Sequence, residues 1–103
     1  MDYLMIFKAL ANDTRLQMML WLKEPEVNFP SAVPLTSEHH FEGGICVGKI
    51  QEKTGLSQST TSQYLSLLQR SGLLEARRIG QWTYYRRSEE TLQRLSEYIG
   101  KEL

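Results

Sequence analysis

Residues 55–65 read GLSQSTTSQYL, a turn followed by a helix whose first half is polar but uncharged. Ser57 is a residue type that commonly caps a helix N-terminus, and Gly72 suits the position just after the last helical turn. The face of this helix expected to be buried holds Thr61, Leu65 and Leu68. A further helix is expected over residues 45–53, and the two are joined by a turn of about four residues around Gly55, which predicts a helix-turn-helix.

The segments on either side complete the expected fold. Apolar residues at helical spacing and typical caps predict helices over residues 2–11 and 12–23 and a last helix that begins after Ser88. Two strands are expected over residues 73–79 and 82–87. A two-stranded hairpin directly after a helix-turn-helix is a wing. The sequence therefore predicts one domain over residues 1–103, mainly α with a small β-hairpin, of the winged helix-turn-helix class.

Residues 24–44 form an irregular insert within this pattern. The insert holds all three prolines, both histidines and the pair Gly43-Gly44. A loop longer than about 12–15 residues is uncommon and is usually functional or disordered. Its apolar side chains are expected either to line a small-molecule pocket or to widen a dimer interface, and they are Val27, Phe29, Val33, Leu35 and Phe41.

The composition excludes several classes of protein. With 103 residues and 41% hydrophobic content, the chain suits one compact domain. Its longest apolar run, residues 18–22, is far shorter than the roughly 20 residues that a membrane span needs. The first seven residues, MDYLMIF, lack a basic region, so we expect no secretory signal. The single cysteine, Cys46, excludes an intramolecular disulfide framework and favours a reducing, cytoplasmic setting.

The distribution of charge is more informative than its total. The formal net charge is zero, with twelve basic and twelve acidic residues. Residues 49–87 nevertheless carry seven Lys or Arg and only two Asp or Glu, between two acidic ends. A local excess of positive charge determines where a polyanion can dock, although such clusters are often only a solvated surface. The basic segment coincides with the predicted helix-turn-helix and hairpin.

The residue types on the second helix of the pair favour reading of DNA bases. Amide and hydroxyl side chains can hydrogen-bond base edges, and small side chains let a helix lie deep in a major groove. The alternative is a solvent-facing helix start with Ser57 as its cap. On this helix the candidate DNA-contacting residues are Ser57, Gln58, Ser59, Thr60, Ser62, Gln63 and Tyr64. On the hairpin they are Arg77, Arg78 and Gln81, with the arginines as phosphate contacts.

Four motifs resemble the ArsR-type winged-helix repressors. They are LANDTRL over residues 10–16, GLSQSTTSQYL over 55–65, GLL over 72–74 and GQWTYY over 80–85. The resemblance covers about residues 5–99 apart from the insert. It implies a cytoplasmic homodimer, built on the first and last helices, that binds palindromic operators in double-stranded DNA. It further implies a repressor that releases the operator on sensing a small effector.

The sequence departs from this family at its metal-sensing positions. Many metal-sensing members carry a C-x-C pair before the recognition helix, where this chain has Cys46 and then Gly48. A soft-metal site needs two or three thiolates, and residues 88–103 contain no His for the other family site. We therefore predict no metal site, no cofactor and no catalytic residue. His39 and His40 lie close enough to Cys46 in sequence to leave a zinc or copper site as an alternative.

Two other classes of function remain as alternatives. A winged helix used only to bind proteins would show apolar or aromatic anchors, and Tyr64 and Trp82 are candidates for such anchors. A thiol hydrolase would use Cys46 with His39 or His40, but the chain shows no third group to orient them. A DNA-binding regulator is the leading interpretation because it accounts for both the polar helix and the basic hairpin arms.

Overall fold

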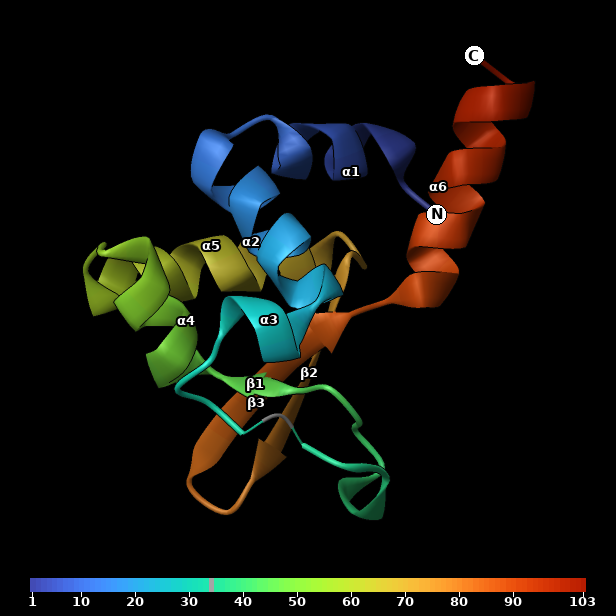
Figure 1. Ribbon diagram of the computed structural model, residues 1–103. Coiled ribbons are helices and arrows are strands. Elements are labelled where there is room, and N and C mark those ends of the chain that lie inside the picture. The colour runs from blue at the N-terminus through green and yellow to red at the C-terminus, as the bar shows by residue number, and fades with distance from the viewer. Residues whose placement is uncertain (34) are drawn as a thin grey trace.

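The computed structural model describes residues 1–33 and 35–103 and shows helices packed around a small antiparallel sheet (Figure 1). In chain order the elements are α1 (Tyr3–Leu10), α2 (Asp13–Lys23), α3 (Pro25–Asn28), the 3-10 turn η1 (Ser37–His39), β1 (Ile45–Cys46), α4 (Val47–Thr54), α5 (Gln58–Arg70), β2 (Leu74–Ile79), β3 (Trp82–Arg87) and α6 (Glu89–Lys101). The predicted class, a mainly helical winged helix-turn-helix, is confirmed. The hairpin β2–β3 is the wing, and α4 and α5 are the helix-turn-helix.

The helices begin where the sequence places their caps. The side chains of Asp2, Asn12, Ser57 and Ser88 each accept a hydrogen bond from a backbone N–H in the first turn of α1, α2, α5 and α6, respectively. Each cap satisfies one of the N–H groups that the first turn of a helix leaves without a partner. α5 ends at Arg70, and Gly72 after the C-cap residue Ser71 has a φ of +89°, the left-handed conformation that glycine adopts most readily.

One predicted boundary is wrong. A single helix was expected over residues 45–53, but residues 45 and 46 form strand β1 and α4 begins at Val47. The cause is long-range pairing, because Ile45 lies opposite Tyr85 and Cys46 opposite Tyr84 in an antiparallel ladder with β3. The sheet therefore has three strands in the order β1-β3-β2. The side chain of Ile45 is buried, but it projects from a strand rather than from a helix.

The insert is more ordered than its composition indicates. It holds α3, which Pro25 begins, and the short turn η1. Phe29 joins the main core, whereas Val27 and Val33 are 66% and 89% exposed. Pro34, one of the three prolines of the insert, lies outside the described residues. Phe41 is buried as well, but it packs away from the main core cluster.

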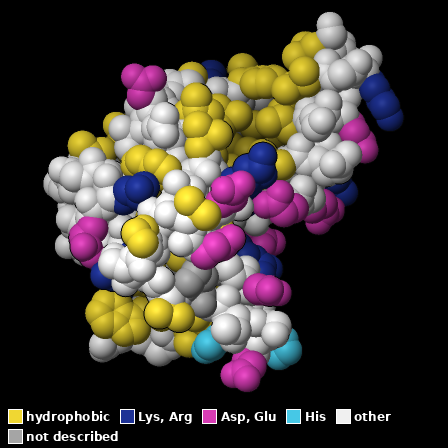
Figure 2. Space-filling model, in the orientation of Figure 1, with side chains coloured by type: hydrophobic (Ala, Val, Ile, Leu, Met, Phe, Trp, Pro, Cys, Tyr) yellow, Lys and Arg dark blue, Asp and Glu magenta, His cyan; other side chains and the backbone are white. Residues whose placement is uncertain are grey.

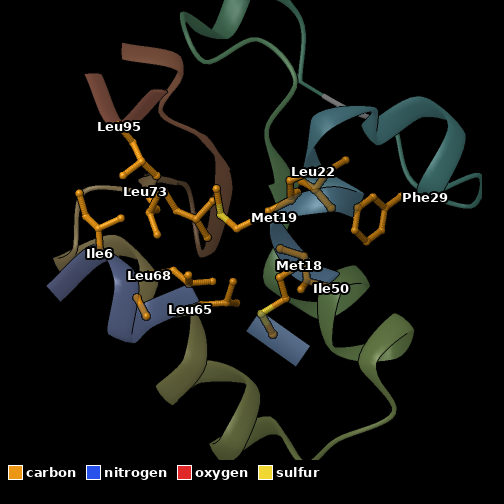
Figure 3. Packing of buried hydrophobic residues seen from close by; sticks show 13 residues of the cluster. Ile6, Met18, Met19, Leu22, Phe29, Ile50, Leu65, Leu68, Leu73 and Leu95 are labelled. Carbon is orange, nitrogen blue, oxygen red and sulfur yellow. The ribbon is translucent and has the colours of Figure 1, made fainter. Parts of the chain in front are cut away.

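The core lies between α1, α2, α4, α5 and the inner face of the sheet, and α6 adds Leu95 to it (Figure 3). Its fully buried members include Ile6, Met18, Ile50, Leu65 and Leu68, which come from four helices. Side chains alternate along a strand, so Leu74 and Ala76 of β2 face this core together with Ile45 of β1. The core thus fixes how α5 and the wing lie relative to each other.

The last helix leaves the body of the protein beside α1 (Figure 1). Tyr98 of this helix contacts α1, because its ring stacks on that of Tyr3 with centroids 3.8 Å apart. Hydrophobic side chains gather between these two helices on the surface (Figure 2), and Leu4 and Ile99 are 64% and 47% exposed. Among the described residues no helix has the length and apolar character to cross a membrane.

Candidate nucleic-acid interface

The N-terminal half of α5 presents an uncharged polar face to solvent. Thr61, Leu65 and Leu68 are fully buried, as the sequence predicts, and they anchor the opposite side of the helix. The side chains expected to read bases are exposed, namely those of Ser57, Gln58, Ser59, Ser62 and Gln63. Thr60 and Tyr64 are half-buried at the edges of this face. We call these seven residues the α5 polar face.

The turn before α5 is fixed by hydroxyl groups. Gly55 has a φ of +70° and ends α4, and its N–H bonds to the Gln51 carbonyl at 3.1 Å. The Thr54 hydroxyl donates to the Gln51 carbonyl at 2.8 Å and accepts from the backbone N–H of Leu56 at 3.1 Å. The buried hydroxyl of Thr61 lies 3.3 Å from that of Thr54. These contacts tie the start of α5 to the end of α4 and so set the direction of the α5 polar face.

Tyr64 is held by an arginine that the sequence did not single out for this role. The guanidinium carbon of Arg15 lies 5.1 Å from the centre of the Tyr64 ring. The same group donates to the carbonyls of Ala9 at 2.7 Å and Lys8 at 3.2 Å, near the end of α1. Arg15 therefore links α1, α2 and α5. The signal for it is its place in the LANDTRL motif of residues 10–16.

The two neighbouring arginines of β2 project from opposite faces of the wing. In the β2–β3 ladder Arg78 lies opposite Thr83. Its side chain is on the face turned to the core, the same face as Leu74 and Ala76. Arg77 lies opposite Tyr84, and its side chain is on the outer face. There its guanidinium donates to the carbonyls of His39 at 3.1 Å and His40 at 3.2 Å. Both arginines are exposed. Within the residues that the structure describes, no hydrogen bond or ion pair engages the guanidinium of Arg78.

The remaining wing arginines are paired within the chain. Arg86 forms a 2.8 Å ion pair with Glu75, directly opposite on β2. Arg87 donates two hydrogen bonds of 3.1 Å to the carboxylate of Glu89. Gln81 lies at the exposed tip, beside Gly80, whose φ is +62°. The side of the wing facing the core thus offers Arg78, and the tip offers Gln81, to a polyanion.

An aromatic side chain lies near each end of the wing, on opposite faces. Trp82 is 52% exposed near the tip. Tyr85 lies at the base, on the inner face beside Ile45 and Ala76, and its burial raises the pKa of its phenol above the usual 10.0. The folded wing therefore favours the protonated form of the Tyr85 phenol.

The residues considered for a metal site are spread over two elements. His39 and His40 are exposed at η1, and Figure 2 shows the histidines at the lower end of the molecule. Cys46 is half-buried in β1 on the outer face, next to Tyr84. Across residues 1–33 and 35–103, no three His, Cys, Asp or Glu side chains are grouped as metal ligands.

The comparisons with known proteins agree with this arrangement. Residues 41–76, from the end of the insert through the helix-turn-helix into β2, match the family described as "Bacterial regulatory protein, arsR family". The HTH-type transcriptional regulator YbzH of Bacillus subtilis is 43% identical over 103 residues, which is the full length of both chains. The arsenic resistance transcriptional regulator ArsR1 of Pseudomonas putida is 35% identical over 85% of this chain, but the match spans only 56% of that protein.

A solved structure extends the likeness to the fold. It is the homodimeric winged helix-turn-helix DNA-binding domain of a possible ArsR-family transcriptional regulator from Mycobacterium bovis. The TM-score is 0.64 at 28% sequence identity, over 98% of this chain and 83% of that one. The insert falls within the region that the full-length match to the Bacillus subtilis protein covers.

Proposed function

The chain belongs to the ArsR family of bacterial regulatory proteins, and we propose that it is a sequence-specific DNA-binding transcriptional regulator that places α5 in the major groove. One observation carries the proposal. The α5 polar face is uncharged and rich in hydroxyl and amide groups, and five of its seven residues are exposed, whereas Thr61, Leu65 and Leu68 on the other side of the helix are fully buried. A solvated helix of no further function would be better served by Lys and Glu, which favour helix formation and solubility.

The proposed division of labour follows from side-chain chemistry. Gln58 and Gln63 can each present an amide to adenine N6 and N7, and Ser59 and Ser62 are short enough to admit the helix to a groove roughly 12 Å wide. Arg78 is assigned to the phosphate backbone and Gln81 to the neighbouring groove. We expect the α5 residues to supply base preference and Arg78 to supply affinity that is independent of sequence.

We further propose a homodimer built on α1 and α6. The apolar side chains of Leu4 and Ile99 are exposed on these helices, although α6 packs on its own chain through Leu95 and the Tyr3–Tyr98 stack. Exposed apolar surface of this kind is typical of an interface. A two-fold dimer would set two α5 helices roughly 34–36 Å apart, one turn of DNA, and would read a palindromic operator.

The proposed output is repression relieved by a small effector. The effector differs from that of a thiolate-based arsenic sensor. One cysteine per chain cannot supply the two or three thiolates that the coordination shell of a soft metal needs. The cavity of about 410 Å³ between α2, the insert and the base of the wing is where an effector could reach all three, and it is lined by charged residues that include Lys23, Glu42 and Arg86.

The experiment that tests this function selects bound duplexes from a random DNA pool with the purified protein. Fluorescence anisotropy then measures Kd for the selected duplex and for a scrambled one over a range of salt concentrations. We expect a palindrome and a Kd that rises steeply with salt, because bound phosphates release counterions. Absence of salt-dependent DNA binding would overturn the proposal and favour the protein-binding alternative.

A further inference from the structure

The insert and the wing meet at one buried aromatic ring. Phe41 is only 3% exposed, yet it lies outside the main core cluster. The guanidinium carbon of Arg86 lies 4.3 Å from the centre of its ring, and that of Arg77 lies 5.4 Å away. Arg77 is on β2 and Arg86 is on β3. Their cation–π contacts with the Phe41 ring therefore connect both strands of the hairpin to the insert.

The polar ends of the same two arginines are also bound by the insert. Arg77 donates to the carbonyls of His39 and His40, and Arg86 donates to that of Glu42 at 3.4 Å besides its ion pair with Glu75. His40 has a φ of +54°, a conformation that non-glycine residues rarely adopt. The insert therefore uses a strained backbone turn at the place where its carbonyls accept from Arg77.

The other end of the insert is fastened to the sheet. Residues 35–44 close a loop through Leu35, whose N–H donates to Gly44 at 3.0 Å and whose carbonyl accepts from Gly43 at 2.8 Å. A Cβ at Gly44 would come within 2.6 Å of the Phe41 ring, so the ring packs directly against this backbone. The next residue, Ile45, begins β1, which pairs with β3. The loop is thus held at both the edge and the outer face of the wing (Figure 1).

We propose that residues 35–44, together with Phe41, Arg77 and Arg86, form a wing clamp that fixes the hairpin relative to α5. In this arrangement Phe41 and Arg77 are positioning residues for DNA binding. Arg78, on the opposite face, is the phosphate contact of the wing. The clamp rests on the proposed function for its role in DNA binding, but its mechanical part is a property of the free protein.

The mechanical part is tested by hydrogen–deuterium exchange without DNA. Phe41→Leu keeps apolar bulk and removes the ring that the arginines cover. We expect the amides of residues 36–43 and of β2 and β3 to exchange several-fold faster than in the wild type. Phe29→Leu is the matched control, because Phe29 is equally buried in the insert but lies near Lys53 of α4. Unchanged exchange in the wing of Phe41→Leu would overturn the clamp, whatever the protein does with DNA.

The assignment of the two arginines is tested by the salt dependence of Kd for the selected duplex. Removing a phosphate contact lowers the slope of log K against log salt by about 0.9. We expect Arg78→Ala to show this loss and Arg78→Lys to restore most of it. Arg77→Ala and Arg77→Lys should both weaken binding with the slope unchanged, because an ammonium group cannot replace a planar guanidinium that donates to two carbonyls and covers a ring.

The contrary outcomes are distinct. A slope that falls for Arg77→Ala and recovers in Arg77→Lys would make Arg77 a phosphate contact and overturn its positioning role. If the wild type shows no salt-dependent binding, the proposed function fails and the phosphate role of Arg78 fails with it. The exchange comparison of Phe41→Leu with Phe29→Leu still decides for or against the clamp.

Discussion

The α5 polar face and the wing are both rich in groups of the kind that can bind nucleic acid, but they differ in the contacts that those groups make within the chain. The exposed amides of Gln58 and Gln63 on α5 point to solvent over a fully buried opposite side. On the wing, Arg77, Arg86 and Arg87 are all engaged by carbonyls, carboxylates or the Phe41 ring of the same chain.

The difference follows from side-chain length and charge. A Ser or Gln on a helix flanked by a buried stripe has few partners within reach. An arginine is long and carries five N–H donors, so it finds carbonyls and rings at a distance. A count of positive charges along the chain therefore overstates the charge that this wing offers to DNA.

The largest effect is expected where α5 is anchored. Leu65 is fully buried beneath the α5 polar face, and Leu65→Ala leaves a cavity in the core. We expect a loss of about 2–5 kcal/mol in the free energy of unfolding, measured by urea denaturation. Leu67→Ala, at a partly buried position on the same helix, should cost clearly less. Equal costs for the two variants would mean that the buried stripe does not hold α5 in place.

A smaller effect is expected at the first turn of α5. The Ser57 hydroxyl oxygen accepts from the backbone N–H of Thr60 at 3.1 Å, so Ser57→Ala leaves that donor unpaired. We expect about 0.5–2 kcal/mol of lost stability. Ser59→Ala, which changes an exposed serine in the first turn of the same helix, should lie within about 0.5 kcal/mol of the wild type. A thermal melt that shifts equally in both variants would contradict a capping role for Ser57.

The smallest effect concerns the base of the wing at alkaline pH. Burial raises the pKa of Tyr85 above 10.0, so the unfolded chain loses this proton at a lower pH than the folded one. The contribution of Tyr85 is complete below pH 10, and stability falls as the pH rises from about 10 through the raised pKa, by at most about 1.4 kcal/mol per pH unit.

Tyr85→Phe should flatten this decline in urea denaturation measured across the alkaline range. Tyr84→Phe is the matched control, since it removes the neighbouring hydroxyl on the outer face and keeps Tyr85. A decline as steep in Tyr85→Phe as in the wild type would show that the phenol of Tyr85 does not cause it.

Most of the fold can be predicted from local sequence patterns. Helical periodicity and cap residues placed α1, α2, α5 and α6 to within a residue or two, and the strand propensity of residues 82–85 placed the wing. Strand β1 was missed because a two-residue strand has no periodicity of its own. Only the ladder with Tyr84 and Tyr85, about forty residues later, makes it a strand.

The candidate site was predicted unevenly for the same reason. The α5 polar face depends on residues within a few turns of one helix, so its exposed and buried sides follow from spacing alone. The contact of Arg77 with His39 and His40 joins positions that are separated by 38 and 37 residues in the sequence. Nothing in the local sequence around Phe41 indicates that two wing arginines will cover its ring.

We propose that the α5 polar face reads DNA bases. Its most direct test is the ratio of the Kd for a scrambled duplex to that for the selected duplex, in Gln63→Ala. Gln69→Ala, an exposed glutamine at the far end of the same helix, is the control. We expect Gln63→Ala to lower this ratio by the equivalent of about 1–3 kcal/mol and Gln69→Ala to preserve it. A ratio in Gln63→Ala equal to that of the wild type and of Gln69→Ala would contradict it.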